Sequence, residues 1–515
     1  MAERSRTIEN SKRKIMFTAQ YNASTLIDDN LAAGRGARTA IYFGDEKISY
    51  HELFGRVCAM AYALQSLNVA RENRLLMILG DTPAFPVSFF GAMRIGAVPV
   101  PVNPLYKASD YRFFLEDSEA RIVIVDAANT EKLNEALVGY GKKIHVIVAE
   151  DLNELLKAYP TEIPPANTHR DDMAFWLYSS GSTGNPKGVV HLHSAIPATC
   201  KTYGKHVLAL NENDIVFGRV LFHAYGIGNA MSFPFSVGAA TVLLPGRVTP
   251  RGILEAISCY RPTVLGLVPT LYNAILNEGE KGDLSSLRRC ISAAEPLAPE
   301  TWRRWKETYN LEILDGIGST EMLHIFCSNT AEECQPGASG KSVPGYELKI
   351  VDDNGSSVNI GDTGHLLVKG ESAAAYYWRN REKTRRTMQG EWMATGDRYR
   401  ADENGFYWCE GRGDDMLKVG GEWVSLIEIE NVLLEHAAVN EAAVVGVNVD
   451  GVMRIRAVII LNEAETATLK NELQQWCKAR LQRFQYPHLI NFVNELPKTA
   501  SGKIQRFKLR QENET

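Results

Sequence analysis

The stretch RLLMILGDTPAFPVSFFGAMRIGAVPVPVNP, residues 74–104, decides the fold class. It opens with a continuous apolar run that ends at Gly80, and such runs are typical of strands that are buried on both faces. Residues 89–97 then predict a helix, and Val98–Val102 predict a second strand. Two buried strands joined through a helix favour a mostly parallel sheet with helices on its faces, which is an α/β fold.

The same alternation extends to both sides of this stretch. Residues 40–50 predict a hairpin around Gly44–Asp45. A helix should follow, because apolar residues recur at helical spacing at Leu53, Val57, Met60 and Leu64. Further buried strands are predicted at 121–126, 145–151, 241–246 and 262–269. We therefore expect a large N-terminal domain of stacked parallel or mixed sheets with helices.

The pattern changes near residue 350. Short strands punctuated by glycine predict a β-rich subdomain, at 348–355, 364–370 and 405–412. The glycine-rich stretch 410–423 is typical of a linker, and two helices and two strands are predicted after it, at 425–436, 442–449, 454–461 and 469–482. The predicted division is an N-terminal domain over residues 1–411, a hinge over 412–416 and a small, mobile α+β C-terminal domain over 417–515.

Composition excludes several classes of function. The 515 residues carry a formal net charge of −5, which gives no general attraction to nucleic acid. Eight cysteines without a C-x-x-C pair do not resemble a zinc site or a disulfide framework. The polar N-terminus lacks the apolar segment of a secretory signal, and no apolar run is long enough for a membrane span. We expect a cytoplasmic protein without integral membrane association.

The strongest chemical signal is YSSGSTGNPKGV, residues 178–189, which follows the apolar strand AFWLY. It gathers three glycines, four Ser or Thr residues and Lys187. Glycines let backbone N–H groups turn toward an anion, while the hydroxyls and the lysine add donors and charge, so the predicted ligand is a polyphosphate. The segment is not a Walker A motif, because Lys187 is followed by Gly188 rather than by Ser or Thr.

This loop resembles the phosphate-binding signature of the adenylate-forming superfamily, which contains acyl-CoA synthetases, luciferases and peptide-synthetase adenylation domains. Four further segments resemble the motifs of that superfamily in the expected order, namely LDGIGSTEM (314–322), WMATGDRY (392–399), GRGDDMLKVGGEWVSLIEIE (411–430) and LPKTASGKIQRFKLR (496–510). The resemblance covers essentially the whole chain. It implies an AMP-forming acid–thiol ligase, an acyl-CoA synthetase that uses ATP, Mg²⁺ and coenzyme A.

The resemblance also implies the roles of individual residues. The catalytic group comprises Lys187, Thr320, Glu321 and Lys503, with Thr320 on the AMP phosphate, Glu321 on the metal and Lys503 between the acid and the α-phosphate. ATP and AMP would contact Ser179, Ser180, Gly181, Ser182, Thr183, Gly184, Ala294, Glu295, Pro296, Asp315, Gly316, Ile317, Asp397 and Arg412. The ribose hydroxyls would fall to Asp397 and Arg412.

The later motifs imply a second half-reaction at the same site. Asp414 would be the hinge about which the C-terminal domain, a lid that carries Lys503, rotates to admit the thiol of coenzyme A. Coenzyme A would contact Lys418, Gly420, Gly421, Glu422 and Trp423, where paired glycines leave room for the thin pantetheine arm.

The acid pocket is assigned from FHAYGIGNA (222–230), SAAEPL (292–297) and MLHIF (322–326), which resemble the benzoate–CoA ligase branch. The implied acid-binding residues are His223, Ala224, Tyr225, Gly318, His324 and Ile325. Ala294 stands where aryl ligands commonly carry glycine, and one extra methyl group can change discrimination by about 1–3 kcal/mol. Cyclohexane- or cyclohexenecarboxylate is therefore an alternative to benzoate.

Other functions would use the same residues. A free-standing adenylation enzyme would deliver the acyl group to a carrier protein instead of coenzyme A, although the segment KVGGEW favours coenzyme A. A non-catalytic paralogue would be expected to lack Lys503, Glu321 or Asp397, and all three are present. A luciferase-like oxygenase would require an oxygen-dependent product. The ligase could also run toward ATP formation, and we expect a monomer or a homodimer.

Overall fold

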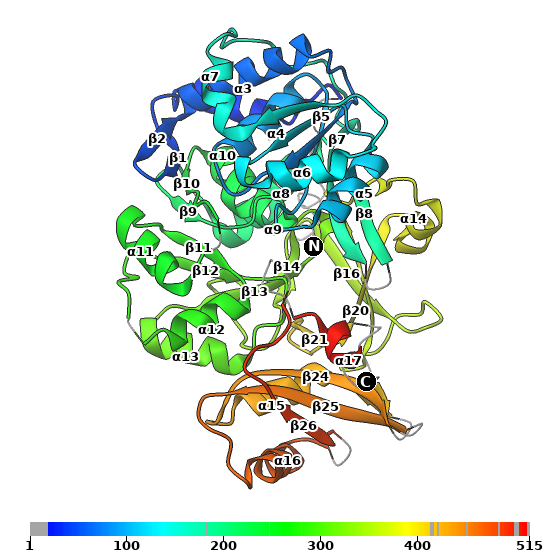
Figure 1. Ribbon diagram of the computed structural model, residues 1–515. Coiled ribbons are helices and arrows are strands. Elements are labelled where there is room, and N and C mark those ends of the chain that lie inside the picture. Colours follow the sequence, from blue (N-terminus) through cyan, green and yellow to red (C-terminus); the bar gives the residue numbers. More distant parts are fainter. Residues whose placement is uncertain are drawn as a thin grey trace, which may run out of the picture.

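The computed structural model describes residues 19–181, 184–246, 248–279, 281–412, 417–419, 422–449, 452–482, 485–498 and 504–511. Figure 1 shows a large body, coloured blue to yellow, with a smaller orange and red domain beneath it. The large body contains several stacked sheets covered by helices, and the smaller domain contains a two-stranded ribbon and a three-stranded sheet with helices against it. The predicted α/β architecture is confirmed.

A four-stranded parallel sheet lies near the N-terminus, in the order β4 (Val98–Pro101), β3 (Arg74–Ile78), β5 (Ile122–Val125) and β6 (His145–Val148). Its strands are joined by α4 (Ala84–Arg94), α5 (Ala108–Ser118) and α6 (Thr130–Leu137). The strand β3 ends before the predicted Gly80, because the Gly80 N–H leaves the ladder and donates to the Asp126 carboxylate at 2.7 Å.

The helix α4 is apolar on nearly every side, and all residues from Phe85 to Arg94 are buried. A helix of that composition has to lie in the core. Its one charge, on Arg94, is offset by two hydrogen bonds to Asp28 at 2.8 and 2.9 Å. It packs on the long helix α3 (Tyr50–Ser66), whose predicted apolar positions are all buried.

A nine-stranded sheet forms the centre of the large body. Its order is β15 (Lys341–Ser342), β14 (Ile325–Ser328), β13 (Ile313–Gly318), β12 (Arg289–Ser292), β11 (Val264–Leu267), β9 (Ile215–Phe217), β10 (Ala240–Val242), β1 (Thr39–Phe43) and β2 (Glu46–Ser49). The six central strands, β13, β12, β11, β9, β10 and β1, are parallel. The strands β2, β14 and β15 are antiparallel additions at the two edges.

Helical segments connect or cover these strands. The α-helices are α2 (Thr25–Ala32), α7 (Leu152–Leu156), α8 (Ala195–Thr199), α9 (Ala224–Ile227), α10 (Phe233–Val237), α11 (Pro250–Tyr260), α12 (Pro269–Asn277) and α13 (Pro299–Tyr309). Two segments are π-helical, η4 (Cys200–Leu208) and η5 (Gly228–Ser232). π-Helical turns are frequent at functional sites, and both of these lie beside the predicted acid pocket.

The β-rich subdomain expected after residue 350 is present. It is antiparallel and contains β16 (Tyr346–Val351), β17 (Gly364–Gly370), β19 (Met388–Gln389), β20 (Trp392–Ala401) and β21 (Tyr407–Arg412). The short helix α14 (Arg381–Thr387) precedes β19. A separate hairpin, β7 (Met173–Gly181) and β8 (Gly184–Leu192), carries β18 (Tyr376–Tyr377) at its edge.

The C-terminal domain begins with the ribbon β22 (Leu417–Val419) and β23 (Glu422–Val424). A three-stranded sheet of β24 (Val439–Val449), β25 (Val452–Leu461) and β26 (Leu489–Phe492) follows, with α15 (Leu426–Leu434), α16 (Leu469–Arg480) and α17 (Arg506–Gln511). Within the described ranges no helix is long and apolar enough to cross a membrane.

Candidate active site

The glycine-rich segment forms the end of a hairpin rather than the long loop that we expected. Ser179 lies opposite Lys187, and Gly181 lies opposite Gly184, so both strands continue almost to the tip. The reason is that the backbone groups of these residues continue the antiparallel ladder, with a register irregularity between Ser179 and Gly181. Ser182 and Thr183 lie outside the described residues, and so do the predicted residues Asp414, Gly420, Gly421 and Lys503.

Glu321 connects this hairpin to the central sheet. It lies on a short 3₁₀ helix, Thr320–Met322, between β13 and β14, and the Ser319 hydroxyl caps that helix by accepting the Met322 N–H. Glu321 Oε1 accepts a hydrogen bond from the Ser179 hydroxyl at 3.4 Å and another from the Tyr377 hydroxyl at 2.7 Å. Residues that are far apart in the sequence therefore meet around one carboxylate.

One face of β8 points toward this carboxylate. Lys187 lies with its Nζ 5.8 Å from the centre of the Tyr377 ring, and His191 Nε2 donates to the Thr320 carbonyl at 2.8 Å. Burial lowers the pKa of His191 to about 4, so the ring stays neutral at physiological pH and holds the Thr320–Glu321 backbone against the hairpin.

Sequence reasoning missed both Tyr377 and His191. For His191 a signal existed, because alternate residues of a strand share a face and His191 is four residues after Lys187. Tyr377 had no such signal, since it reaches Glu321 from the separate strand β18.

The predicted nucleotide residues meet at one sheet edge. Ser292 at the end of β12 lies beside Asp315 in β13, so Ala294, Glu295 and Pro296 follow one parallel strand while Gly316 and Ile317 extend the other. Ligands of open α/β sheets bind beyond the carboxyl ends of such strands. The Asp315 carboxyl is buried, and burial raises its pKa to about 8, so it adds little negative charge beneath a nucleotide.

The predicted ribose pair is also brought together. Asp397 in β20 and Arg412 in β21 are directly opposite one another in the antiparallel ladder. The backbone of these two strands thus brings the two predicted ribose-binding positions side by side.

Two of the predicted acid residues, Tyr225 and His324, form an aromatic cluster with Tyr203 and Phe233, which were not predicted. The His324 ring stacks on the Tyr225 ring at 5.7 Å, with 18° between their planes, and Tyr203 and Phe233 pack on its other sides at 4.8 and 4.5 Å. Tyr225 is oriented by its hydroxyl, which donates to the Ile291 carbonyl at 3.1 Å.

The remaining predicted acid residues border this cluster. Gly318 and Ile325 are opposite one another across β13 and β14, and Ala224 and Ile325 are buried. The positive charge of His223, when it is protonated, contributes to lowering the pKa of His324. The described geometry thus places the other four predicted acid residues near the Tyr225–His324 stack.

His324 makes the stability of the protein sensitive to acid. Burial lowers its pKa to about 3 in the folded protein, below the value of about 6.5 of an unfolded chain. Protons therefore bind preferentially to the unfolded state, so this contribution to stability is complete above pH ~6.5 and is lost as the pH falls toward 3. We expect His324→Phe to reduce the slope of unfolding free energy against pH by about 1.4 kcal/mol per pH unit between pH 6 and 4. Urea titrations across that range measure the slope, and an unchanged slope would contradict the assignment.

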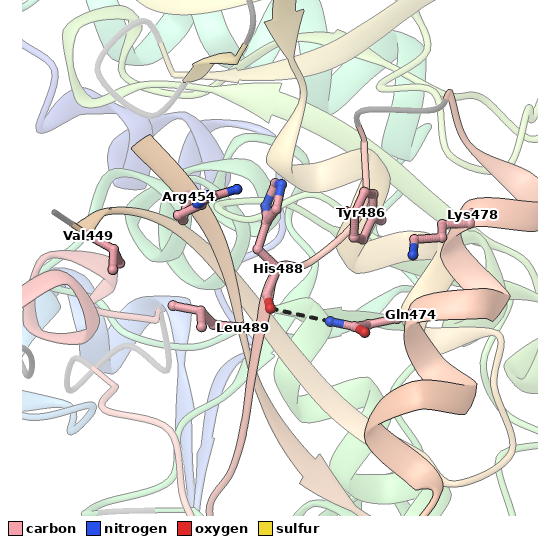
Figure 2. Close-up of a pocket in the computed structure, with 7 residues that line it drawn as sticks. All are labelled: Val449, Arg454, Gln474, Lys478, Tyr486, His488 and Leu489. Carbon is pink, nitrogen blue, oxygen red and sulfur yellow. Dashed lines mark hydrogen bonds between the residues drawn. The ribbon is translucent and has the colours of Figure 1, made fainter. Parts of the chain in front are cut away.

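The C-terminal domain places the predicted coenzyme A residues on one ribbon. Lys418 lies opposite Trp423 across β22 and β23, and Val419 lies opposite Glu422. Elsewhere on this domain, between α16, β25 and β26, a hollow of about 320 Å³ is lined by Arg454, Lys478, Tyr486 and His488 among others. Figure 2 shows Arg454 and Lys478 on opposite sides of His488.

This hollow is electropositive. Burial lowers the pKa of His488, and the charges of Arg454 and Lys478 lower it further. Lys478 Nζ also lies 4.3 Å from the centre of the Tyr486 ring. A hollow that holds two cations and an aromatic ring suits a ligand that carries both phosphates and a flat base.

The donor set around Glu321 fits magnesium. In the described part of the chain no group of three or more acidic, histidine or cysteine side chains could hold a metal alone. Mg²⁺ is commonly bound through one or two carboxylates together with substrate phosphates. Both hydrogen bonds to Glu321 fall on Oε1. They fix the orientation of the carboxylate, and therefore also the position of Oε2.

Comparison with known proteins agrees with this geometry. The model of the family described as AMP-binding enzyme matches residues 29–378, and that of the AMP-binding enzyme C-terminal domain matches residues 428–503. The chain belongs to the AMP-binding enzyme family. The predicted class, an AMP-forming acid–thiol ligase that uses ATP, Mg²⁺, coenzyme A and a small carboxylic acid, is thereby confirmed.

Several relatives are similar over their full length. The benzoate–CoA ligase of Thauera aromatica is 42% identical over 97% of this chain and 98% of its own. The 4-hydroxybenzoate–CoA/benzoate–CoA ligase of Rhodopseudomonas palustris is 40% identical over 95% of this chain and 94% of its own. Among solved structures, an anthranilate–CoA ligase in complex with anthranoyl-AMP has a TM-score of 0.93 at 40% identity, over 96% of this chain and 98% of that chain. A benzoate–CoA ligase from Burkholderia xenovorans has a TM-score of 0.90 at 43% sequence identity, over 95% of this chain and 100% of that chain.

Proposed function

We propose that this protein is a benzoate–CoA ligase, which joins benzoate or a closely similar six-membered-ring acid to coenzyme A and splits ATP to AMP and diphosphate. The observation that carries the proposal is the aromatic cluster of Tyr225 and His324, which adjoins the Thr320–Glu321 segment held against the phosphate hairpin. The relatives named for benzoate and hydroxybenzoates support this choice of acid.

Adenylate formation brings two anions together. The acid carboxylate attacks the α-phosphate and expels diphosphate, so cations have to offset the repulsion. We assign this task to Lys187 and Lys503, while Thr320 contacts the AMP phosphate and Asp397 with Arg412 binds the ribose. Mg²⁺ held by Glu321 would supply further charge compensation at the phosphates.

Thioester formation follows at the same centre. We propose that the domain over residues 417–515 rotates about a hinge at 412–416, with Asp414 as its pivot, so that Lys503 leaves and the thiol of coenzyme A enters. The thiol then attacks the acyl carbonyl and AMP departs. The ribbon of Lys418 and Trp423 would line the pantetheine path, and the electropositive hollow around Arg454 and Lys478 suits the phosphates of coenzyme A.

Two features bear on the choice between a flat and a puckered ring, namely the loop after β12 and the Tyr225–His324 stack. Ala294 has φ +78° there, a left-handed conformation that favours glycine, and it adds a methyl group to the edge of the site. Benzoate is preferred because the stacked Tyr225 and His324 offer a flat partner. We further propose a cytoplasmic location, synthesis of the thioester as the working direction, and a monomer or homodimer.

Coenzyme A-dependent AMP formation across an acid panel tests the proposal. The panel is benzoate, 4-hydroxybenzoate, cyclohexanecarboxylate, 1-cyclohexenecarboxylate and hexanoate. We expect the highest kcat/KM with benzoate, and a loss of roughly 10²–10³-fold in adenylate formation for Lys503→Ala, by analogy with removal of one oxyanion donor. An alicyclic acid in first place would overturn the benzoate assignment, and absence of AMP with every acid would overturn the ligase.

The same assay also tests whether the hollow around Arg454 and Lys478 binds coenzyme A. Arg454→Glu should raise the KM for coenzyme A about tenfold and leave the KM for benzoate unchanged, because a charge of the wrong sign repels the phosphates. A parallel rise in both constants would contradict a role in binding coenzyme A.

A further inference from the structure

Glu295 joins the two domains through its side chain. It follows β12 in the large body, and its Oε2 accepts a hydrogen bond from the Thr270 hydroxyl of α12 at 2.8 Å. Its Oε1 accepts the backbone N–H of Ile504, in the C-terminal domain, at 3.2 Å. One carboxylate therefore ties the first turn of α12 to a residue about two hundred positions later in the chain.

Ile504 is anchored in its own domain. It forms an antiparallel bridge with Lys498, and the Gln505 N–H donates to the Pro497 carbonyl at 2.7 Å. Lys498 is paired with Glu441 of β24 at 2.7 Å. Ile504 cannot shift alone, so its contact with Glu295 reports on the placement of the whole C-terminal domain.

A second anchor lies directly after Ile504. The Arg506 guanidinium makes three hydrogen bonds to Glu430 of α15, at 2.8, 2.9 and 3.3 Å. Rotation of the C-terminal domain would carry this anchored segment away from Glu295. The hydrogen bond to Glu295 therefore exists only while the domains keep the arrangement seen here.

The contact lies next in the chain to the lysine that is predicted to act in adenylate formation. Ile504 directly follows Lys503 in the sequence, and the Ile504 N–H belongs to the planar peptide unit that begins at the Lys503 Cα. A hydrogen bond to a carboxylate is about twice as strong as one between neutral groups. By contrast, the neighbouring contacts of Asn440 with Asn273 and Asn277 join neutral groups.

We propose that Glu295 is a positioning residue that latches the C-terminal domain in the arrangement for adenylate formation, acting through Ile504 rather than by touching the nucleotide. This rests on the proposed function, because it assumes two half-reactions at one site. The latch has to open before thioester formation. Loss of Glu295 should therefore slow the first half-reaction alone.

Two substitutions of Glu295 separate a latch from a nucleotide contact. In Glu295→Gln the amide oxygen still accepts the Ile504 N–H, and the amide NH₂ can donate to Thr270, so the geometry survives without the charge. In Glu295→Ala both hydrogen bonds are lost. The full-length protein is used, and single-turnover adenylate formation is measured beside thioester formation from preformed benzoyl-adenylate and coenzyme A.

We expect Glu295→Ala to slow adenylate formation about 10–50-fold and to leave thioester formation within about twofold of the unmodified protein. Glu295→Gln should lose about threefold in the first step. Equal loss in both half-reactions would overturn the latch, and so would a Glu295→Gln variant as slow as Glu295→Ala. The unmodified protein in the same assay reports on the ligase itself, so the two failures are distinguishable.

Hydrogen exchange gives a readout that needs no substrate. The amide of Ile504 should exchange at least tenfold faster in Glu295→Ala, while the amides of β24 in the same domain keep their rates. An unchanged rate at Ile504 would overturn the latch whatever the activities are.

Discussion

Replacing Glu321 with glutamine is expected to slow adenylate formation by about 10²–10³-fold. The change preserves the size of the side chain and leaves an oxygen that can accept from Ser179 and Tyr377. What it removes is the negative charge that would hold Mg²⁺ against the phosphates of ATP. Single-turnover assays over a range of Mg²⁺ concentrations measure the loss, which should shrink as Mg²⁺ is raised.

Tyr377→Phe is the matched control for this prediction. It deletes the 2.7 Å hydrogen bond to Glu321 Oε1 and leaves the charge in place, so it should cost about tenfold or less, the equivalent of one hydrogen bond. Neither change should slow thioester formation from preformed adenylate by more than a few fold. If both variants were equally slow and insensitive to Mg²⁺, Glu321 would have only a structural role.

Gly228→Ala should disrupt the acid pocket and destabilise the fold. A Cβ at this position would lie 2.3 Å from His324 Cδ2 and 2.8 Å from Phe233 Cε2, far inside normal contact. The His324 ring has no room to retreat, because Tyr203 and Tyr225 pack on its other sides. We expect a loss of about 3 kcal/mol in unfolding free energy from overpacking. We also expect a fall of 10²-fold or more in kcat/KM for benzoate, because a displacement of about 1 Å is enough for that.

A second substitution tests the cause. Adding His324→Ala to Gly228→Ala removes the ring that the new methyl group strikes, so the double variant should be more stable than the sum of the single losses predicts. Gly55→Ala in α3 is the control, since its Cβ would meet Thr161 only at an ordinary 3.4 Å and a helix interior favours alanine. Strict additivity in the cycle would show that Gly228 and His324 do not clash.

Much of this arrangement was predictable from local sequence. The strands β3 and β4 and the helix α3 follow from apolar runs and helical spacing, and the hairpin β1–β2 follows from Gly44–Asp45. The meeting of Ser179 with Glu321 was expected because motifs in the right order imply one site. The strands and helices follow from the periodicity of apolar residues. The site follows from the residue types that phosphate binding requires.

The remaining features depend on tertiary contacts. The π-helix η4 (Cys200–Leu208) has no sequence signature, since such turns arise from packing rather than from propensity. The left-handed φ of Ala294 was unexpected because alanine disfavours it. The Glu295 carboxylate accepts hydrogen bonds from Thr270 and Ile504, and no local pattern reveals a bond to so distant a residue.

The pairing of β1 with β10 has a consequence during synthesis. Ile41 aligns with Thr241, so the first strand of the central sheet waits for about two hundred further residues before its parallel neighbour exists. Ribosomes add roughly 5–20 residues per second, which leaves the hairpin of β1 and β2 without that neighbour for about 10–40 s. The backbone edge of β1 that β10 occupies in the finished protein stays unpaired for that interval, and an unpaired strand edge is a template for aggregation that a chaperone can shield.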